Sequence, residues 1–269
     1  MIQRSQVEAW LAEDLGHHDV TNDVPGETTG RLVAKEAGTA AGLDAAVATF
    51  DYLDVDAEPA VAVGDRFEPG AVLLRCSGPA RAVLRGERVA VNVVAHAAGI
   101  ATLTRTAVDA ARTVDDEVRI ACTRKTTPGL RGIEKRAVVA GGGDTHRLDL
   151  SHMVMIKDNH IAELGLETAI ERMRERVSFA TKIEVEVETP DAAATAAAAG
   201  ADVVLLDNMA PETVAAAVER LPDHTLAEAS GGITFETVPD YAATGVDVIS
   251  MGSLTHSAPS LDLSFRTGS

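Results

Sequence analysis

From residue 115 onward, short apolar runs alternate with stretches of roughly ten residues that have helical spacing. The apolar runs occupy residues 118–122, 153–156, 183–187, 203–206, 226–229 and 246–251. The helical stretches occupy residues 166–177, 190–199, 211–221 and 235–244. Strands that alternate with helices form parallel sheets, because each helix returns the chain to the same edge of the sheet. The pattern predicts an α/β domain whose strands either close into a barrel or form an open wound sheet.

Polar or charged residues follow nearly every predicted strand. After successive strands come Thr123-Arg124-Lys125, Lys157-Asp158-Asn159-His160, Asp207-Asn208, Ser230-Gly231-Gly232 and Gly252-Ser253. A barrel gathers the carboxyl ends of its strands around one active site, whereas an open sheet binds its ligand at one switch point. The sequence has no GxGxxG that opens a helix and no GxxxxGK[ST]. These features favour a barrel and disfavour dinucleotide and P-loop sites.

The residues before this region have a different pattern. We expect a helix over residues 6–13, a strand near residues 31–35 and an antiparallel sheet over residues 55–84, where Gly and Pro separate short apolar runs. Helical spacing follows over residues 86–113, and we expect Gly99 to divide it into two helices. The change of pattern predicts two domains.

The chain carries 24 Lys and Arg against 41 Asp and Glu, a formal net charge of −17. This charge argues against nonspecific binding to nucleic acid or to an anionic membrane. A hydrophobic content of 46% excludes a disordered acidic tail, and no apolar run reaches about 18 residues, the length of a membrane span. The acidic N-terminus does not have the pattern of a signal peptide, and two cysteines, Cys76 and Cys122, build neither a disulfide scaffold nor a four-cysteine zinc site. We therefore expect a cytoplasmic protein.

Only five of the 24 basic residues are Lys. A surface crowded with carboxylates and poor in Lys suggests a salt-adapted (halophilic) protein; the alternative is an ordinary acidic protein. We expect the melting temperature to rise between about 0.1 and 1 M salt, because the Debye length falls from about 10 to about 3 Å and self-repulsion is screened. Thermal melts across this range, with a neutral osmolyte as the control, measure the effect. A flat or falling melting temperature would exclude salt adaptation.

Basic residues cluster in the segment TRKTTPGLRGIEKR (123–136), which is the clearest sign of function in so acidic a chain. Further basic residues follow at His146, Arg147 and Lys157. Arg binds carboxylate or phosphate in a bidentate manner, and burying several cations is favourable only opposite an anionic ligand. We expect the cations at strand ends, Arg124, Lys125 and Lys157, to form an anion site. Ion pairs with surface acids explain three others equally well: Arg131, Lys135 and Arg136.

Glycine-rich segments follow the last two predicted strands, at residues 230–232 and 252–253. Barrels of this type often bind phosphate there through backbone N–H groups, although simple tight turns are the alternative. Glu186 and Asp207 lie on neighbouring strands, and paired acids beside a phosphate suggest Mg²⁺. Glu184 and Glu188 share the face of Glu186 if the segment is extended. No histidine spacing indicates zinc.

Together these motifs resemble the quinolinate phosphoribosyltransferase family, also called carboxylating nicotinate-nucleotide pyrophosphorylases. The matching segments are LAEDLGHHDVT (11–21), ERVAVN (87–92), GIATLT (99–104), TRKTTPGLRGIEKRAV (123–138), GGG with HR (141–147), MIKDNHI (155–161), IEVEVET (183–189), ADVVLLDNM (201–209), EASGGIT (228–234) and GVDVISMGSLTHS (245–257). TRKTTPGLR and IKDNH are highly specific. The resemblance implies an N-terminal open-faced α/β sandwich over residues 1–105 and an incomplete, seven-stranded α/β barrel over residues 106–259, with residues 260–269 packed on the first domain.

The implied reaction joins quinolinate to phosphoribosyl pyrophosphate with Mg²⁺. It gives nicotinate mononucleotide, pyrophosphate and carbon dioxide, a step of de novo NAD biosynthesis. The resemblance also implies a homodimer or higher even oligomer that shares its active sites between subunits, with Arg88 acting in the partner's site.

The resemblance assigns roles by motif position. The implied quinolinate pocket contains Arg88, Arg124, His146, Arg147 and Lys157. Lys125 is shared by both substrates, while Glu186 and Asp207 serve the ribose hydroxyls and Mg²⁺; these three are the implied catalytic residues. The implied 5′-phosphate cradle contains Gly231, Gly232, Gly252 and Ser253. Further substrate contacts are expected from Thr123, Ser230 and Met251.

Three positions depart from the usual family pattern: Ala98, Thr145 and His152. None removes a proposed charged contact. Three other functions are considered: a homologous barrel protein found beside molybdate transporters, a non-catalytic anion sensor, and a Schiff-base aldolase that uses Lys125 or Lys157.

Overall fold

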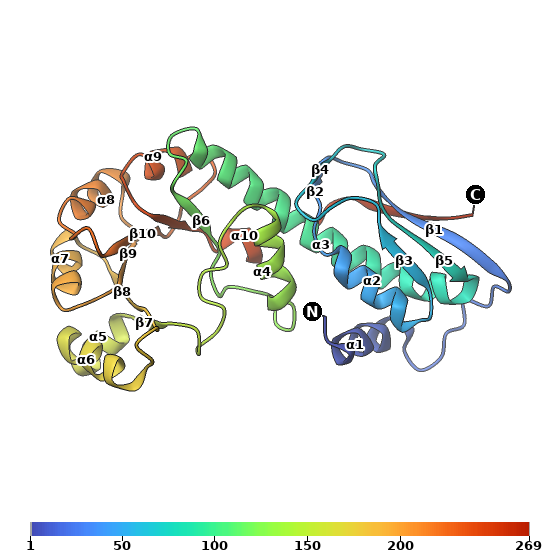
Figure 1. The fold of residues 1–269 in the computed structure, drawn as a ribbon, viewed down its shortest axis with the longest axis horizontal. Helices are drawn as coiled ribbons and strands as arrows, with labels where there is room; N and C mark the ends of the chain where they lie inside the picture. Colours follow the sequence, from blue (N-terminus) through green and yellow to red (C-terminus); the bar gives the residue numbers. More distant parts are fainter. Residues whose placement is uncertain (1, 269) are drawn as a thin grey trace. The chain divides into compact units, whose positions relative to one another are not determined.

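The computed structural model describes residues 2–268, which form two compact units (Figure 1). The first unit contains the chain up to Arg105, the segment Thr127–Gly142 and the chain from Ser257. The second unit contains Thr106–Thr126 and Gly143–His256. The segment Thr127–Gly142, which we expected in the barrel domain, thus groups with the first unit. Its helix α4 (Arg131–Ala140) makes side-chain contacts there, such as the Arg136–Asp44 ion pair at 3.3 Å.

The first unit is built on a four-stranded antiparallel sheet with the order β12-β1-β5-β3. Its strands are β1 (Glu27–Ala34), β3 (Asp56–Pro59), β5 (Val72–Pro79) and β12 (Leu263–Thr267). The short strands β2 (Gly38–Thr39) and β4 (Arg66–Phe67) pair separately. The helices are α1 (Arg4–Leu15), α2 (Leu43–Tyr52) and α3 (Ala80–Arg112).

The core of the first unit lies between one face of this sheet and the helices. Leu32 and Leu74 of the sheet pack with Phe50 of α2 and with Val83 and Val94 of α3. Each fully buried apolar side chain of this size contributes about 1.5–3 kcal/mol. The alternate positions of the strands carry polar side chains, so the opposite face of the sheet has no apolar layer, as the open-faced sandwich requires.

Helix α3 is continuous from Ala80 to Arg112, so the prediction that Gly99 divides it was wrong. A Cβ atom at Gly99 would lie 1.9 Å from the carbonyl oxygen of Pro259. Glycine is therefore required by close packing of the C-terminal segment against the helix and does not interrupt the helix. That segment continues into β12, which pairs antiparallel with β1.

The second unit contains a six-stranded parallel sheet with the order β6-β11-β10-β9-β8-β7. Its strands are β6 (Arg119–Ala121), β7 (Val154–Ile156), β8 (Ile183–Val187), β9 (Val203–Asp207), β10 (Leu226–Ser230) and β11 (Val248–Ser250). A parallel bridge between Ala121 and Asp144 adds a seventh position beside β6. The first strand pairs with the last, as in a barrel, and β7 has no ladder to the Asp144 segment within residues 2–268, which leaves the barrel incomplete.

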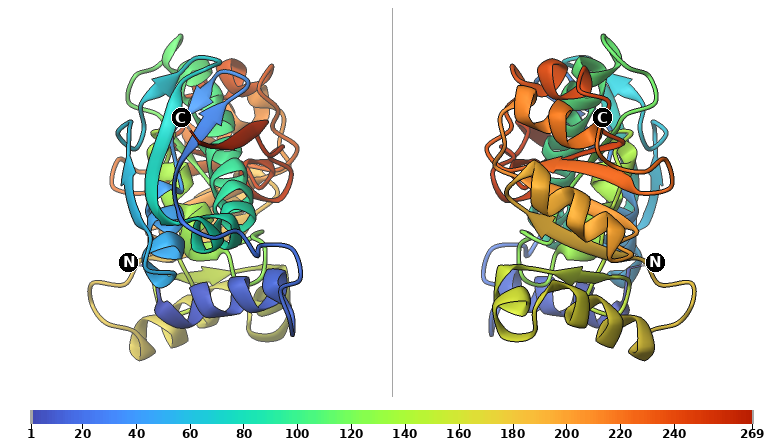
Figure 2. Two further views of the ribbon diagram at one scale, coloured as in Figure 1. Left: turned by 90° about the vertical axis from the view of Figure 1, so that its right-hand side faces the viewer. Right: turned by 90° about the vertical axis from the view of Figure 1, so that its left-hand side faces the viewer.

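Helices connect the barrel strands and lie outside them, as the right-hand view of Figure 2 shows for α6, α7 and α8. They are α5 (Asp158–Leu164), α6 (Leu166–Arg176), α7 (Pro190–Ala198), α8 (Pro211–Val218), α9 (Val238–Ala242) and α10 (Ser253–His256). Pro occupies the first turn of α7, α8 and α9, where no N–H is needed, and Thr189 caps α7 by accepting the N–H of Ala192 at 3.2 Å. Among residues 2–268, no helix combines the length and apolar character that a membrane crossing requires.

Candidate active site

A cavity of about 650 Å³ opens at the carboxyl ends of the barrel strands. It is lined by residues of β7, β8, β9, β10 and β11 and by residues that follow β6, β7, β9, β10 and β11, together with His146 and Arg147. Of the predicted site residues, every one except Arg88 lines this cavity. The topology explains this result, because the ends of neighbouring parallel strands meet at one rim.

The predicted cations of the barrel lie together in the cavity. Arg124 and Lys125 follow β6, and Lys157 follows β7. Arg147 is buried and donates from Nη2 to the Met155 sulfur at 3.2 Å. Burial, together with the nearby charge of Arg124, lowers the pKa of the Arg147 guanidinium from its usual value. Two guanidinium groups that repel each other in a partly desolvated cavity favour an anionic ligand.

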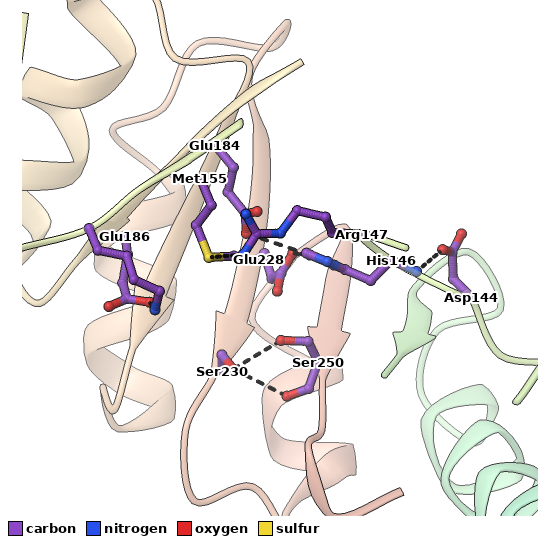
Figure 3. Close-up of polar contacts among 10 residues, drawn as sticks. Asp144, His146, Arg147, Met155, Glu184, Glu186, Glu228, Ser230 and Ser250 are labelled. Atoms are coloured by element: carbon purple, nitrogen blue, oxygen red, sulfur yellow. Dashed lines mark hydrogen bonds and ion pairs between the residues drawn. The ribbon is translucent and has the colours of Figure 1, made fainter. Parts of the chain in front are cut away.

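Beneath these cations, His146 lies between two buried carboxylates (Figure 3). Its Nε2 atom is 2.8 Å from Oε2 of Glu228 and 3.5 Å from Oε1 of Glu184. Burial alone would lower the pKa of His146, but the hydrogen bonds and charges of Glu184 and Glu228 outweigh it and raise the pKa to about 10. The two carboxylates therefore favour the imidazolium form of the ring, in which both ring nitrogens carry a proton.

Glu184 and Glu228 were not among the predicted site residues. Glu184 is fully buried, and burial raises the pKa of its carboxyl group. It shares an inward face with Glu186, as the period-two spacing predicted, whereas Glu188 lies beyond β8 and is exposed. Glu228 is an acid within a buried strand, and that anomaly is the sequence signal that could have identified it.

The two predicted metal ligands lie on adjacent parallel strands, Glu186 on β8 and Asp207 at the end of β9. The strand register places Glu186 opposite Leu205, so Asp207 lies one pleat further toward the cavity rim on the same face. Glu186 forms an ion pair with Lys157, and Oδ2 of Asp207 accepts a hydrogen bond from Asn208 at 2.7 Å. Both carboxylates line the cavity.

The glycine-rich segments follow the neighbouring strands β10 and β11 on the same rim. Gly231 has φ +94°, and a Cβ atom there would lie 2.3 Å from Oδ1 of Asn208, so only glycine fits. A Cβ atom at Gly252 would lie 2.9 Å from Cδ of Lys125. Beside them, the Ser250 hydroxyl donates to Ser230 Oγ at 2.9 Å. The remaining predicted members also line the cavity: Thr123, Gly232, Met251 and Ser253.

Some of the basic residues lie elsewhere. Three of them, Arg131, Lys135 and Arg136, belong to α4 of the first unit and are not among the residues that line the cavity. Arg88, on α3, is 59% exposed, and its guanidinium lies 3.7 Å from the carboxylate of the preceding residue, Glu87.

The departures from the family pattern are accommodated locally. The hydroxyl of Thr145 donates to the carbonyl of His146 at 3.2 Å, and Nδ1 of His152 accepts the N–H of Leu148 at 3.2 Å. Ala98 is buried within α3. None of these three residues is among those that line the cavity.

Comparison with known proteins agrees with this geometry. The N-terminal domain of quinolinate phosphoribosyl transferase matches residues 19–98, and its C-terminal domain matches residues 100–266. The chain belongs to the quinolinate phosphoribosyltransferase family. The boundary between the two matches falls within α3, which runs through both segments.

Several curated relatives cover nearly the whole chain. A probable carboxylating nicotinate-nucleotide pyrophosphorylase of Methanothermobacter thermautotrophicus is 45% identical over 266 residues, which is 95% of each chain. The human carboxylating nicotinate-nucleotide pyrophosphorylase is 40% identical and is aligned over 97% of this chain and 90% of its own length. Members of this family therefore share both units with the present chain.

Solved structures of the family show the same fold. NadC from Streptococcus pyogenes superposes with a TM-score of 0.92 at 40% identity, over 98% of this chain and 95% of its own. The nicotinate-nucleotide pyrophosphorylase from Francisella tularensis gives a TM-score of 0.93 at 30% identity, over 100% and 98%. The predicted fold class, a sandwich followed by an incomplete barrel, is confirmed.

Proposed function

We propose that this chain is a quinolinate phosphoribosyltransferase that converts quinolinate and phosphoribosyl pyrophosphate into nicotinate mononucleotide, pyrophosphate and carbon dioxide, in de novo NAD biosynthesis. The observation that carries the proposal is one cavity in which a cluster of cations faces two carboxylates and two glycine-rich segments. Both substrates are polyanions, so both need cations, and the phosphates need backbone N–H groups that approach closely. Family membership supports the same reaction.

Quinolinate carries two adjacent carboxylates on a pyridine ring, and the buried cations suit it. Arg124, Arg147 and His146 come from the segments after β6 and around Asp144, so they lie on one side of the cavity. Arg forks hold planar carboxylates at two points. We propose that these residues, with Lys157, bind and orient quinolinate so that its ring nitrogen faces the ribose carbon C1′.

In the chemical step, the quinolinate nitrogen forms a bond to C1′ while the bond from C1′ to the pyrophosphate oxygen breaks. The ribose passes through an oxocarbenium-like state, as in other glycosyl transfers. The 2-carboxylate then leaves as carbon dioxide, its electron pair stays on C2 beside the cationic ring nitrogen, and C2 takes a proton. Lys125 lies on the cavity rim next to Gly252, where we propose that it contacts both substrates and stabilises negative charge on the leaving pyrophosphate.

The acids of the cavity fit Mg²⁺. Carboxylate oxygens are hard ligands, and Mg²⁺ is usually held by one or two carboxylates together with substrate phosphates and water. Glu186 and Asp207 supply two carboxylates on one face, one pleat apart, beside the proposed phosphate cradle. Bound Mg²⁺ would neutralise charge on the pyrophosphate. We also propose an even oligomer in the cytoplasm.

We predict that the 2-carboxylate is obligatory. With nicotinate, the cations that hold this group would remain buried and unpaired, which costs about 1–3 kcal/mol or more, so binding should weaken at least about tenfold. The experiment mixes the pure protein with phosphoribosyl pyrophosphate, Mg²⁺ and either acid, and measures nicotinate mononucleotide. Efficient use of nicotinate would contradict the proposal.

The same assay separates the alternatives. An anion sensor would bind quinolinate without turnover. A Schiff-base aldolase would be trapped by borohydride at Lys125 or Lys157 with a carbonyl substrate. A relative specialised for another substrate would release no carbon dioxide from quinolinate.

A further inference from the structure

The two buried acids beside His146, of which Glu228 also lines the cavity, are not explained by binding of an anionic ligand. Glu184 and Glu228 carry the same charge as the proposed substrates, and both are almost fully buried. The polar contact of Glu184 is with Nε2 of His146, at 3.5 Å from Oε1, and Glu228 contacts the same nitrogen through one of its two oxygens, Oε2. Burying carboxylates is costly unless they act on a neighbouring group.

The group on which they act is His146. Glu184 on β8 and Glu228 on β10 flank strand β9 and project inward, toward the same ring nitrogen, Nε2 (Figure 3). A carboxylate only accepts hydrogen bonds, so Nε2 carries a proton. The backbone of His146 is also fixed: its φ is +50°, and its N–H donates to Oδ1 of Asp144 at 2.7 Å.

This arrangement leaves the other ring nitrogen for the ligand. No hydrogen bond among residues 2–268 involves Nδ1 of His146, while the residue lines the cavity. We propose that Glu228, assisted by Glu184, is a positioning residue that holds the His146 ring so that Nδ1–H donates to a carboxylate of the bound ligand. The inference rests on the proposed function, since that ligand is quinolinate.

The charges around the ring support this role. His146 faces the acids Glu184 and Glu228, while the cations Arg147 and Arg124 lie in the same cavity. Asp144 contacts its backbone N–H. The carboxylates raise the pKa of the ring against the effect of burial. Without Glu228, burial would still lower the pKa of the ring and only Glu184 would oppose it, so the pKa should fall toward that of a neutral ring, which has only one N–H to donate.

A double-mutant cycle on the full chain tests the proposal. We expect Glu228→Gln to weaken quinolinate binding about tenfold in calorimetry and to raise its KM more than it lowers kcat. His146→Asn should weaken binding similarly, and adding Glu228→Gln to it should change little, because Glu228 acts through the ring. Additive effects of the two substitutions would overturn the proposal.

A second histidine–glutamate pair provides a matched control. In the first unit, Nε2 of His96 lies 2.9 Å from Oε1 of the fully buried Glu134, and neither residue lines the cavity. Glu134→Gln makes the same chemical change, so any loss of stability should be comparable. It should leave the quinolinate dissociation constant unchanged. An equal loss of affinity in Glu134→Gln would make the effect of Glu228 a general folding effect and overturn the proposal.

A readout without substrate keeps this test separate from the proposed function. The ¹⁵N shifts of the His146 ring should show both nitrogens protonated from about pH 6 to 8 in the wild type, and a neutral ring at the upper end in Glu228→Gln. A neutral wild-type ring, or an unchanged ring in the variant, would overturn the positioning role even if quinolinate is the substrate. Loss of wild-type quinolinate affinity on chelation, restored by Zn²⁺, would also overturn it, because Nε2 would then be a metal ligand. Failure of the wild type to bind quinolinate, with the expected ring shifts, would refute only the proposed function.

Discussion

Replacing Asp207 with alanine should lower the turnover number by about two orders of magnitude while leaving quinolinate affinity nearly unchanged. The carboxylate of Asp207 lies at the rim end of β9, beyond the level of Glu186 and beside the glycine-rich segment after β10. If the proposed roles hold, a charge placed there would act on the ribose and the pyrophosphate, whose charge changes during the proposed reaction. Asp207 is an acid and does not belong to the group of buried cations that suits the quinolinate carboxylates.

The measurement combines quinolinate titration with Mg²⁺-dependent initial rates. Asp202→Ala is the matched control, because Asp202 precedes the same strand at its opposite end and does not line the cavity. Its carboxylate accepts hydrogen bonds from Arg174 and from the N–H of Ile183, so its loss should reduce stability but not turnover. Large loss of quinolinate binding in Asp207→Ala with a normal rate at saturation would contradict the metal role.

Glu186→Ala should also lower the turnover number, but its effect should not be confined to turnover. Its carboxylate pairs with Lys157, which we place in the quinolinate pocket. Removing Glu186 therefore takes away one proposed metal ligand and also frees a cation near the other substrate. We expect a similar fall in turnover, accompanied by a change in quinolinate affinity that Asp207→Ala does not show.

The barrel was predictable from the sequence because its strands are buried on both faces. In β9, the first four residues are buried, so the strand is a nearly continuous apolar run. Helix α5 was missed because none of its residues is buried and no apolar stripe marks it. Helix α4 was missed because its buried face includes the charged residues Glu134 and Lys135, so no continuous apolar stripe marks it.

The part of the site that is formed by residues following the strands was predictable from the sequence. The parallel barrel places the residue after each strand at one rim, so the proposed ligands of both substrates converge without further information. The layer beneath was not predictable, because it depends on register. Glu184 lies opposite Val203 and Glu228 opposite Leu205, on the two sides of β9, and His146 reaches both acids from a segment that forms a single bridge in the sheet. No local sequence pattern indicates that residues so far apart in the chain come into contact.

Arg88 is the one predicted site residue that the cavity of the second unit does not contain, and we expect it to act in the site of a partner subunit. Arg88 is exposed on α3, and its ion pair with Glu87, at 3.7 Å between adjacent residues, is weak. A strand-end cavity is open to water, and electrostatic catalysis improves when water is excluded. A guanidinium supplied by a second subunit would close the site and bind a quinolinate carboxylate. The alternative is that Arg88 is simply a surface residue paired with Glu87.

Two inactive variants distinguish these possibilities. Arg88→Ala and Lys125→Ala are each expected to lose nearly all activity, since one removes a quinolinate contact and the other a contact to both substrates. When they are unfolded, mixed and refolded, about half of the dimers should be mixed, and each mixed dimer should hold one doubly altered site and one intact site, so activity should return to roughly a quarter of the wild type. Purified heterodimers, isolated with two affinity tags, should have about half the wild-type activity.

The control is Arg81→Ala, which removes another exposed Arg from the same helix, two turns earlier. It should be active alone, because nothing places Arg81 near a substrate. If verified heterodimers of Arg88→Ala and Lys125→Ala recover no activity, then Arg88 serves its own subunit's site or none. If Arg88→Ala is fully active alone, the surface pair with Glu87 is its whole role. Activity can recover only if one site combines Arg88 of one subunit with Lys125 of the other. A site on an open barrel rim needs this arrangement if it is to exclude water and bind a dicarboxylate.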